Sequence, residues 1–517
     1  MRRQNPCSGF ITMNPMTMIL RIAAVGLLSL SLGDTASAKT LRIAMISPAI
    51  TFGAPYSRDE GGMIRWAIYD NLTIITPGGD LSPSLAESWT IENDTTWIFK
   101  LRTGVVFSNG EVFDAAAAAA AINSLIDPTR RFPRLLDIPG IVGARARDAT
   151  TLEIVTAKPD PLLARRLSLV PIPAPKAWAE MGPEVFAKNP IGTGPFRVVK
   201  WGAAGYRLEA VPTSWRKSKQ IDVIETNTIT DATARIKALL SGRVDVALGL
   251  GPDDLEEIKA AGYTTRIVPI PSVLAVAFRT VRDDAAPLKD VRVRLALNYA
   301  VDKETIVATI LAGTTRVASQ GTVPGIPGYN SNLKPYAYDP AKAKALLSEA
   351  GYPNGFNLSI LVYGGLLPND TTIFQKVAQD LGAIGVNVEL RSMTFPDYAR
   401  RLFNGDWEGF DAFSNGWLSI GIGDPIRAVD QFSCGYNAPF FCEPGMMPLI
   451  DATRTEMDPI KRDKLMQNVM AEFNKVGVAL WLVEFSTITG LSPRVKNYAT
   501  RGEGISINFE AIELETK

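Results

Sequence analysis

The chain has 517 residues, of which 46% are apolar, 8% aromatic and 21% charged, a composition typical of a globular protein with more than one domain. Its 54 basic and 53 acidic side chains nearly cancel, so net charge gives no support for nucleic acid as a partner. The sequence contains no histidine, which excludes Ser-His-Asp and Cys-His catalysis and every imidazole metal site.

The first 38 residues are typical of a secretory signal peptide. Arg2, Arg3 and Arg21 precede an apolar run over 22–32, and small residues follow at 36–38. A run of about eleven apolar residues is too short to span a bilayer, which needs about 20. We therefore predict that residues 1–38 are cleaved and that the mature protein is released into the periplasm.

Strand-like and helix-like segments alternate along the rest of the chain and predict a mixed α/β fold. Residues 97–101 alternate as a strand, and the seven alanines at 115–121 predict a helix after Asp114, since alanine has the highest helix propensity. The glycine-rich turn at 192–195 leads into a strand at 196–201. A dinucleotide-binding motif would require a helix there, so we interpret 192–195 as a tight turn.

Several later helices are marked by capping residues at both ends. The helices of 232–241, 303–312, 340–350 and 459–473 each follow an aspartate that can cap them, and three of them end at a glycine. A strand at 244–248 and a helix at 252–261 lie between the first two. For the helix after Asp302 the predicted buried face consists of Ile306, Val307, Ile310 and Leu311.

Two cysteines, Cys434 and Cys442, remain after removal of the signal peptide. An even pair in an exported protein predicts a disulfide bond. The loop that it closes is short, so chain entropy predicts a stabilisation of about 2.5 kcal/mol.

The sequence offers little for catalysis or metal binding. Any metal site would need carboxylates alone, and the acidic residues at 253–257 open a helix, where they favour the helix dipole. We predict no metal and no cofactor. Hydrolysis by a pair of carboxylates stays open, because it needs only two acidic residues.

Polar and aromatic residues near the ends of predicted strands are the candidates for ligand binding. Tyr363 follows the strand at 358–362, and Asn415 and Trp417 follow the segment 410–413. Ligands of α/β proteins bind beyond the carboxyl ends of strands. These three residues are therefore predicted binding residues.

Four sequence blocks resemble the extracellular solute-binding proteins of family 5, the binding components of ABC importers for oligopeptides, dipeptides and nickel. The first block is LAESW at 85–89 with WIFKLR at 97–102 and GVVFSNG at 104–110. GTGPF at 192–196 is the second. The third is LKDVRVRLAL at 288–297 with AVDK at 300–303, and the fourth is YDPAKAKALL at 338–347 with AGYP at 350–353. Together they place the resemblance over residues 41–517.

The resemblance implies a two-lobed periplasmic binding protein of the cluster C type, with no enzymatic activity. Lobe I would comprise 39–275, including an extra subdomain, together with the C-terminal return 486–517, and lobe II would comprise 276–485. We expect the chain to cross between lobes in irregular segments near 270–280 and 482–490. A small-molecule solute would lie between hinged lobes, and the protein, a monomer, would deliver it to permease subunits in the inner membrane.

The departures from the family pattern bear on the ligand. Peptide binders of the family carry an acidic residue between a tryptophan and an Asp-Pro pair, where this chain has Ile420 and Gly421. Neither can pair with the ammonium of a free peptide, and the histidine of the nickel binders is absent. The resemblance therefore favours a modified peptide, opine, amino-acid derivative or sugar.

The resemblance adds four residues to the candidates Trp417, Asn415 and Tyr363. Arg279 and Arg427 could bind a carboxylate or phosphate, and Phe52 and Tyr56 follow the first strand of lobe I. An exported hydrolase that uses a carboxylate pair is the alternative function, and a sensor on the same fold is a third.

Overall fold

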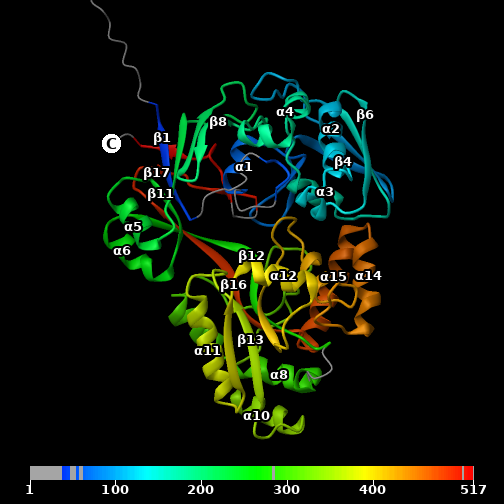
Figure 1. Ribbon diagram of the computed structural model, residues 1–517, viewed down its shortest axis with the longest axis vertical. Helices are drawn as coiled ribbons and strands as arrows, with labels where there is room; N and C mark the ends of the chain where they lie inside the picture. Colours follow the sequence, from blue (N-terminus) through cyan, green and yellow to red (C-terminus); the bar gives the residue numbers. More distant parts are fainter. Residues whose placement is uncertain (1–37, 47–53, 58–61, 282–285, 503–505, 516–517) are drawn as a thin grey trace, which may run out of the picture. The chain divides into compact units, whose positions relative to one another are not determined.

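The computed structural model describes residues 38–46, 54–57, 62–281, 286–502 and 506–515 (Figure 1). The predicted signal peptide, apart from Ala38, and the candidate Phe52 lie outside the described residues. Residues Lys39–Lys517 form one compact unit. None of the helices in the described ranges is long and apolar enough to cross a membrane.

A ten-stranded mixed sheet joins strands of the first half of this unit (residues 40–250) to strands of its second half (residues 264–491). Its strands lie in the order β14 (Asn387–Met393), β13 (Asn357–Tyr363), β15 (Ala412–Leu418), β12 (Thr264–Phe278), β16 (Ala479–Leu491), β11 (Val246–Leu250), β1 (Thr40–Met45), β10 (Val223–Thr228), β9 (Gly205–Ala210) and β8 (Phe196–Gly202).

The two long strands β12 and β16 run antiparallel in the centre of this sheet (Figure 1). The first part of β12 pairs only with β16, and its last seven residues, Ser272–Phe278, also pair with β15. The register shifts between Ile270 and Val273, next to Pro269 and Pro271, because proline has no N–H for the ladder. The expectation that the segments near 270–280 and 482–490 are irregular is therefore wrong, because most of their residues lie in the strands β12 and β16, whose pairing carries a bulge.

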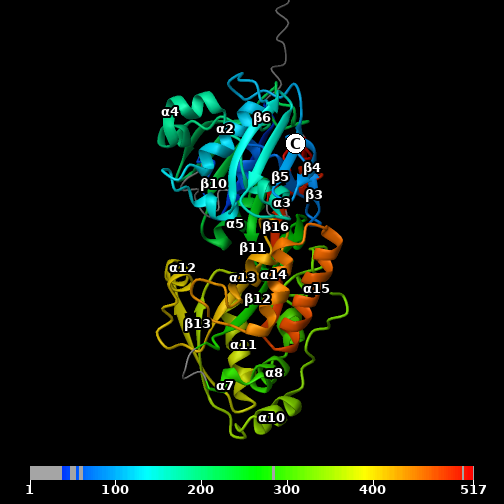
Figure 2. The same cartoon turned by 90° about the vertical axis from the view of Figure 1, so that its right-hand side faces the viewer.

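A second, four-stranded antiparallel sheet follows in the order β4 (Ala86–Asn93), β5 (Thr96–Leu101), β7 (Thr151–Thr156) and β6 (Ile141–Asp148). The helix α2 (Ala115–Ile126) lies beside this sheet (Figure 2). Asp114 caps α2 by accepting a hydrogen bond from the Ala117 N–H at 2.8 Å. The alanine run is thus a helix, as the sequence predicts, and its small side chains allow close packing on the sheet.

Three of the other predicted helices begin where their aspartate caps place them: α5 (Ala232–Leu240), α10 (Pro340–Glu349) and α15 (Pro459–Lys475). The segment after Asp302 differs, since α9 (Lys303–Thr305) continues as a π-helix over Ile306–Ile310. There the Leu311 N–H reaches the Ile306 carbonyl, and the wider turn leaves Val307 and Ile310 only half-buried.

The remaining α-helices of the described residues are α1 (Gly62–Ile68), α3 (Leu163–Arg166), α4 (Pro175–Lys188), α6 (Leu255–Ala260), α7 (Ala286–Lys289), α8 (Val291–Ala300), α11 (Asp370–Gly382), α12 (Phe395–Asn404), α13 (Ile426–Gln431) and α14 (Met447–Thr455). Small antiparallel pairs join β2 (Thr73–Ile75) to β3 (Leu81–Pro83), β17 (Val495–Lys496) to β20 (Glu513–Leu514), and β18 (Thr500–Arg501) to β19 (Ser506–Ile507).

The hydrophobic core is divided along the chain. One cluster of buried side chains draws on residues 41–248 and 491–514. Two other clusters draw on residues 270–485, joined by Leu162. The exact lobe boundaries, 39–275 with 486–517 and 276–485, stay a prediction.

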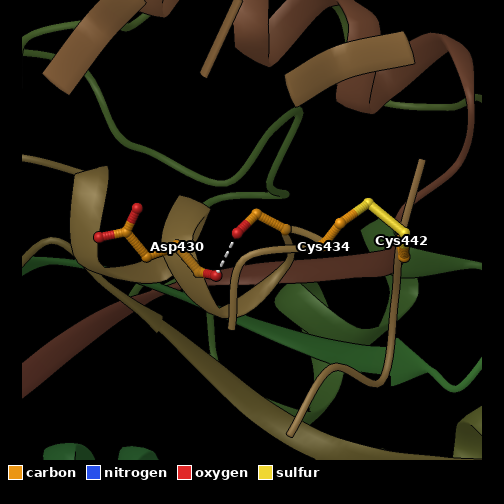
Figure 3. The surroundings of a disulfide bond; sticks show 4 residues. Asp430, Cys434 and Cys442 are labelled. Atoms are coloured by element: carbon orange, nitrogen blue, oxygen red, sulfur yellow. Dashed lines mark hydrogen bonds between the residues drawn. A yellow bond between two sulfur atoms is a disulfide. The ribbon is translucent and has the colours of Figure 1, made fainter. Parts of the chain in front are cut away.

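A disulfide bond joins Cys434 and Cys442, whose Cα atoms lie 4.5 Å apart, as the sequence predicts (Figure 3). The segment before it is fixed by the Ser433 hydroxyl, which donates to the Asp430 carbonyl at 2.8 Å. The closed loop carries the buried side chains of Phe440 and Phe441 into the core.

Candidate functional site

A cavity of about 720 Å³ is lined by residues from both halves of the chain. One wall comes from α1 and the segments around Asp137 and Ser168, and the other from α12, α13 and the ends of β13 and β15. Parallel pairing of β13 with β15, Ile360 with Ala412, brings the carboxyl ends of these two strands to the same edge of the sheet. The sheet topology therefore places Tyr363 and Asn415 at the cavity.

Asn415 presents a donor at this cavity. It is 1% exposed, and its Oδ1 accepts a hydrogen bond from the Tyr398 hydroxyl at 2.6 Å. Its Nδ2 has no hydrogen-bond partner among the described residues. A buried amide donor without a partner is costly, so this atom is the least satisfied polar group of Asn415.

Charged side chains at the cavity are mostly cationic. Arg65, Arg134 and Arg427 line it, with Asp137 as the single carboxylate among its described lining residues. Arg134 Nη1 lies 2.9 Å from Asp137 Oδ2, whereas Arg427 Nη1 lies 3.9 Å from Asp137 Oδ1. The Arg427 side chain is 45% exposed, so its guanidinium is only partly covered by the protein.

The segment that departs from the family pattern also lies at the cavity. Ile420 and Gly421 line it, so no carboxylate is found at either position. Asp424 lies deeper and pairs with Arg462 at 2.5 and 3.0 Å, fully buried. Its charge is thus compensated within the protein.

The loop at 421–423 is attached to the other half of the chain through its backbone. Arg165 Nη1 donates to the carbonyls of Ile422 and Gly423, and also to that of Gly79, each at 3.0 Å. The Ser168 hydroxyl donates to the Gly421 carbonyl at 3.2 Å. These contacts link 79 and 165–168 to the loop beside the cavity.

Of the seven candidate ligand-binding residues, the structure brings three together at the cavity: Asn415, Tyr363 and Arg427. Their role in binding stays a prediction. Phe52 lies outside the described residues.

Trp417 is fully buried and does not line the cavity. The predicted strand over 410–413 is observed at Ala412–Leu418, so Trp417 is part of β15 and does not follow it. Its ring packs against Phe432 and Trp481, with centroids 4.2 and 4.7 Å away. A Cβ at Gly321 would lie only 2.2 Å from the indole, which shows how closely this loop covers it.

Arg279 and Tyr56 also lie away from the cavity. Arg279 is buried and donates from Nη1 to the Phe410 carbonyl. Tyr56 is buried in the core of the first half, where its hydroxyl donates to the Ala121 carbonyl at 2.9 Å. Neither residue is among those that line the cavity, and their role in binding stays a prediction.

Sequence reasoning missed Arg65, Arg134, Asp137 and the residues of α12. Arg134 and Asp137 are spaced i, i+3, which is a weak signal for an ion pair within one turn. The stripe of α12 had a clearer signal, since its apolar residues recur at helical spacing from 395 to 403. Among the residues that the structure describes, no group of three Asp, Glu or Cys side chains could hold a metal ion.

A cavity lined from two halves of a chain, which are connected by long central strands, defines a two-lobed ligand-binding protein of the α/β class. The chain belongs to the bacterial extracellular solute-binding proteins of family 5, whose middle region matches residues 80–439. Family 5 proteins are the solute-binding components of ABC importers. The resemblance and the fold class predicted from sequence are thereby confirmed.

The chain is similar to the nickel-binding periplasmic protein of Escherichia coli K12, at 29% identity over 86% of this chain and 89% of that protein. It is 27% identical to heme-binding protein A of Haemophilus influenzae, over 83% of this chain and 84% of that protein. Among solved structures, NikA from Brucella suis in complex with Fe(III)-EDTA matches with a TM-score of 0.81 and 26% identity, over 92% of this chain and all of that one.

A further solved structure, the binding protein AgaA in complex with agropinic acid, has a TM-score of 0.73 at 21% identity, covering 92% of this chain and 99% of that chain. This match shows the fold alone. The ligands named for these proteins differ from one another, so family membership does not define a substrate. Because these relatives are binding proteins and not enzymes, they suggest no catalytic activity.

Proposed function

We propose that this protein is the periplasmic solute-binding component of an ABC importer for a small organic acid, such as an opine, an amino-acid derivative or a modified peptide. Residues 1–38 would direct export and be removed. The monomeric protein would enclose the solute between its lobes and deliver it, unchanged, to a permease in the inner membrane.

The proposal of an acidic ligand rests on the hydrogen-bond donors among the residues that line the cavity. Asn415 Nδ2 is a buried donor without a described partner, and the Arg427 guanidinium is only partly covered by the protein. A carboxylate could accept hydrogen bonds from both groups with its two oxygens and would also pair with the positive charge of the guanidinium. A neutral sugar could satisfy the amide but carries no charge for the guanidinium.

Two observations argue against the other functions. Ile420 and Gly421 supply no carboxylate for the ammonium group of an unmodified peptide. Hydrolysis by paired carboxylates needs two acidic groups at the bound substrate, whereas the described lining residues include only Asp137, which is paired with Arg134.

The experiment is a thermal-shift screen of the mature protein against opines and acidic amino-acid derivatives, free dipeptides and neutral sugars, followed by calorimetric titration. A ligand at 100 times its Kd stabilises by about 2.7 kcal/mol, so acidic solutes should give the largest shifts. Mass spectrometry after incubation should recover the solute unchanged. The proposal fails if dipeptides or neutral sugars give the largest shift, or if product accumulates.

Arg427→Gln tests the site itself. Loss of a charge-assisted hydrogen bond predicts about tenfold weaker binding of the acid, with little change in unfolding temperature. Arg400→Gln is the matched control, since Arg400 is similarly exposed but does not line the cavity. Equal effects of the two substitutions would contradict a specific role for Arg427.

A further inference from the structure

The helix α12 turns its apolar face toward the cavity. The residues of this helix that line the cavity are Phe395, Tyr398, Ala399, Leu402 and Phe403. Their spacing of three and four residues places them on one side of the helix. Tyr398 and Leu402, in the middle of the stripe, are buried in a core cluster, whereas its ends extend beyond that cluster along the cavity.

The two ends of this stripe are unusually exposed. Phe395 is 62% exposed and Phe403 is 59% exposed, although each belongs to the lining of the cavity. Burial of an exposed phenylalanine side chain is favourable because it removes apolar surface from water. Two exposed rings at one cavity therefore represent binding energy that becomes available when an apolar group covers them.

The middle of the stripe is rigidly held. Tyr398 packs against Tyr363 at 4.1 Å between ring centroids and against Trp407 at 6.2 Å, and Phe395 lies 5.8 Å from Tyr363. Tyr398 is also fixed by its hydrogen bond to Asn415. Rings whose positions are already fixed lose little conformational entropy on binding. The aromatic face of α12 is therefore preorganised to stack on a flat ligand.

The polar groups of the cavity limit what that partner can be. Asn415 Nδ2 and Arg427 supply donors, while α12 supplies an aromatic surface. A purely apolar ligand would leave the buried amide donor unsatisfied, and a small hydrophilic acid would leave the two phenylalanines uncovered. An occupant that carries both an acid group and an aromatic or conjugated ring satisfies both requirements.

We infer that the solute is an amphipathic organic acid, whose flat apolar part lies on the aromatic face of α12 while its acid group meets the donors of the cavity. This inference rests on the proposed function and narrows its ligand class. The cavity of about 720 Å³ has room for a ring system with an acidic substituent.

The test compares three probes by calorimetric titration. The probes are 2-naphthoate, which has ring and acid, propionate, which has the acid alone, and 2-naphthalenemethanol, which has the ring alone. We expect saturable 1:1 binding of 2-naphthoate, with at least about tenfold weaker binding of the other two. Absence of saturable 2-naphthoate binding, or equal affinity for propionate, overturns the inference.

The double substitution Phe395→Ser and Phe403→Ser tests the surface. Both side chains are exposed, so the unfolding temperature should change little, while the affinity for 2-naphthoate should fall at least about tenfold. Ile460→Ser on α15 is the matched control, because Ile460 is 81% exposed and does not line the cavity. Unchanged affinity in the double variant overturns the inference. A dimer of the wild-type protein that is absent in the double variant also overturns it, because the two phenylalanines would then form a protein interface.

The two proposals fail in different ways. If acidic solutes bind with a dependence on Arg427 but without a dependence on Phe395 and Phe403, the proposed function stands and this inference falls. If no organic acid binds, or if Arg427→Gln has no effect on any of them, the proposed function itself falls.

Discussion

The Tyr398 hydroxyl donates a hydrogen bond to Asn415 Oδ1 at 2.6 Å, and this contact joins α12 to β15. It fixes the amide so that Oδ1 is used inside the protein, whereas Nδ2 has no partner among the described residues. Burial raises the pKa of Tyr398 well above its ordinary value, so the phenol stays protonated and keeps donating at any pH where the protein is folded.

Tyr398→Phe removes this donor and keeps the ring. We expect a loss of about 1–3 kcal/mol in stability, because Asn415 Oδ1 becomes an unsatisfied buried acceptor, and weaker binding of 2-naphthoate, because the amide is no longer oriented. Thermal unfolding and calorimetry measure the two effects. Tyr436→Phe is the control, since the buried Tyr436 hydroxyl has no described partner, and a comparable loss of affinity there would contradict the role of the contact.

Gly192→Ala should destabilise the protein by at least about 1–3 kcal/mol. A Cβ at this position would lie 2.1 Å from the Ile68 carbonyl oxygen, and backbone cannot move aside as a flexible side chain can. Gly202→Ala is the matched control at the end of the strand that follows, because nothing lies within 4 Å of its Cβ. Similar unfolding temperatures for the two variants would contradict a close-approach role for Gly192.

Removal of the disulfide by Cys434→Ser with Cys442→Ser should lower stability by about 2.5 kcal/mol, the loop-entropy value for a short loop. Addition of dithiothreitol to the wild-type protein should lower the unfolding temperature by a similar amount and leave the double variant unaffected. A wild-type protein insensitive to complete reduction would show that the bond adds nothing to stability.

Lys303 predicts a pH dependence of stability. It is buried, its Nζ donates to the Asn298 carbonyl at 2.7 Å, and burial lowers the pKa of its ammonium group to about 7. Between pH 7 and about 10.4 the unfolded chain therefore holds a proton that the folded chain has released, so stability should rise with pH by up to about 1.4 kcal/mol per unit.

Lys303→Met should flatten this slope, because the titrating group is gone, and should raise stability most at pH 7. Calorimetric unfolding of both proteins at pH 7, 8, 9 and 10 measures the difference. Parallel curves would show that Lys303 keeps its charge in the fold.

The elements that the sequence predicted well depend on local chemistry. Asp114, Asp231, Asp339 and Asp458 cap helices in the structure because their carboxylates accept backbone N–H groups two or three residues further on. The disulfide also followed from a simple pair of cysteines. The helix after Asp302 was harder, since its cap is correct but its π-helical turn depends on packing.

The candidate site was only partly predictable. Tyr363 and Asn415 line the cavity and Trp417 does not, although Asn415 and Trp417 both lie within β15, because the end of β15 lies later than expected and the Trp417 ring packs on Phe432 and Trp481. Arg65 and Arg134 come from segments distant in sequence, and their position at the cavity depends on how the two halves pack. No periodicity in a single sequence carries that information.

The attachment of the 421–423 loop through main-chain carbonyls has a consequence for how the specificity of this protein can evolve. Arg165 and Ser168 bind oxygen atoms that every amino acid possesses. The side chain at 420 can therefore change while these carbonyl contacts to the other half of the chain remain. Position 421 is less free, because its φ of 106° favours glycine.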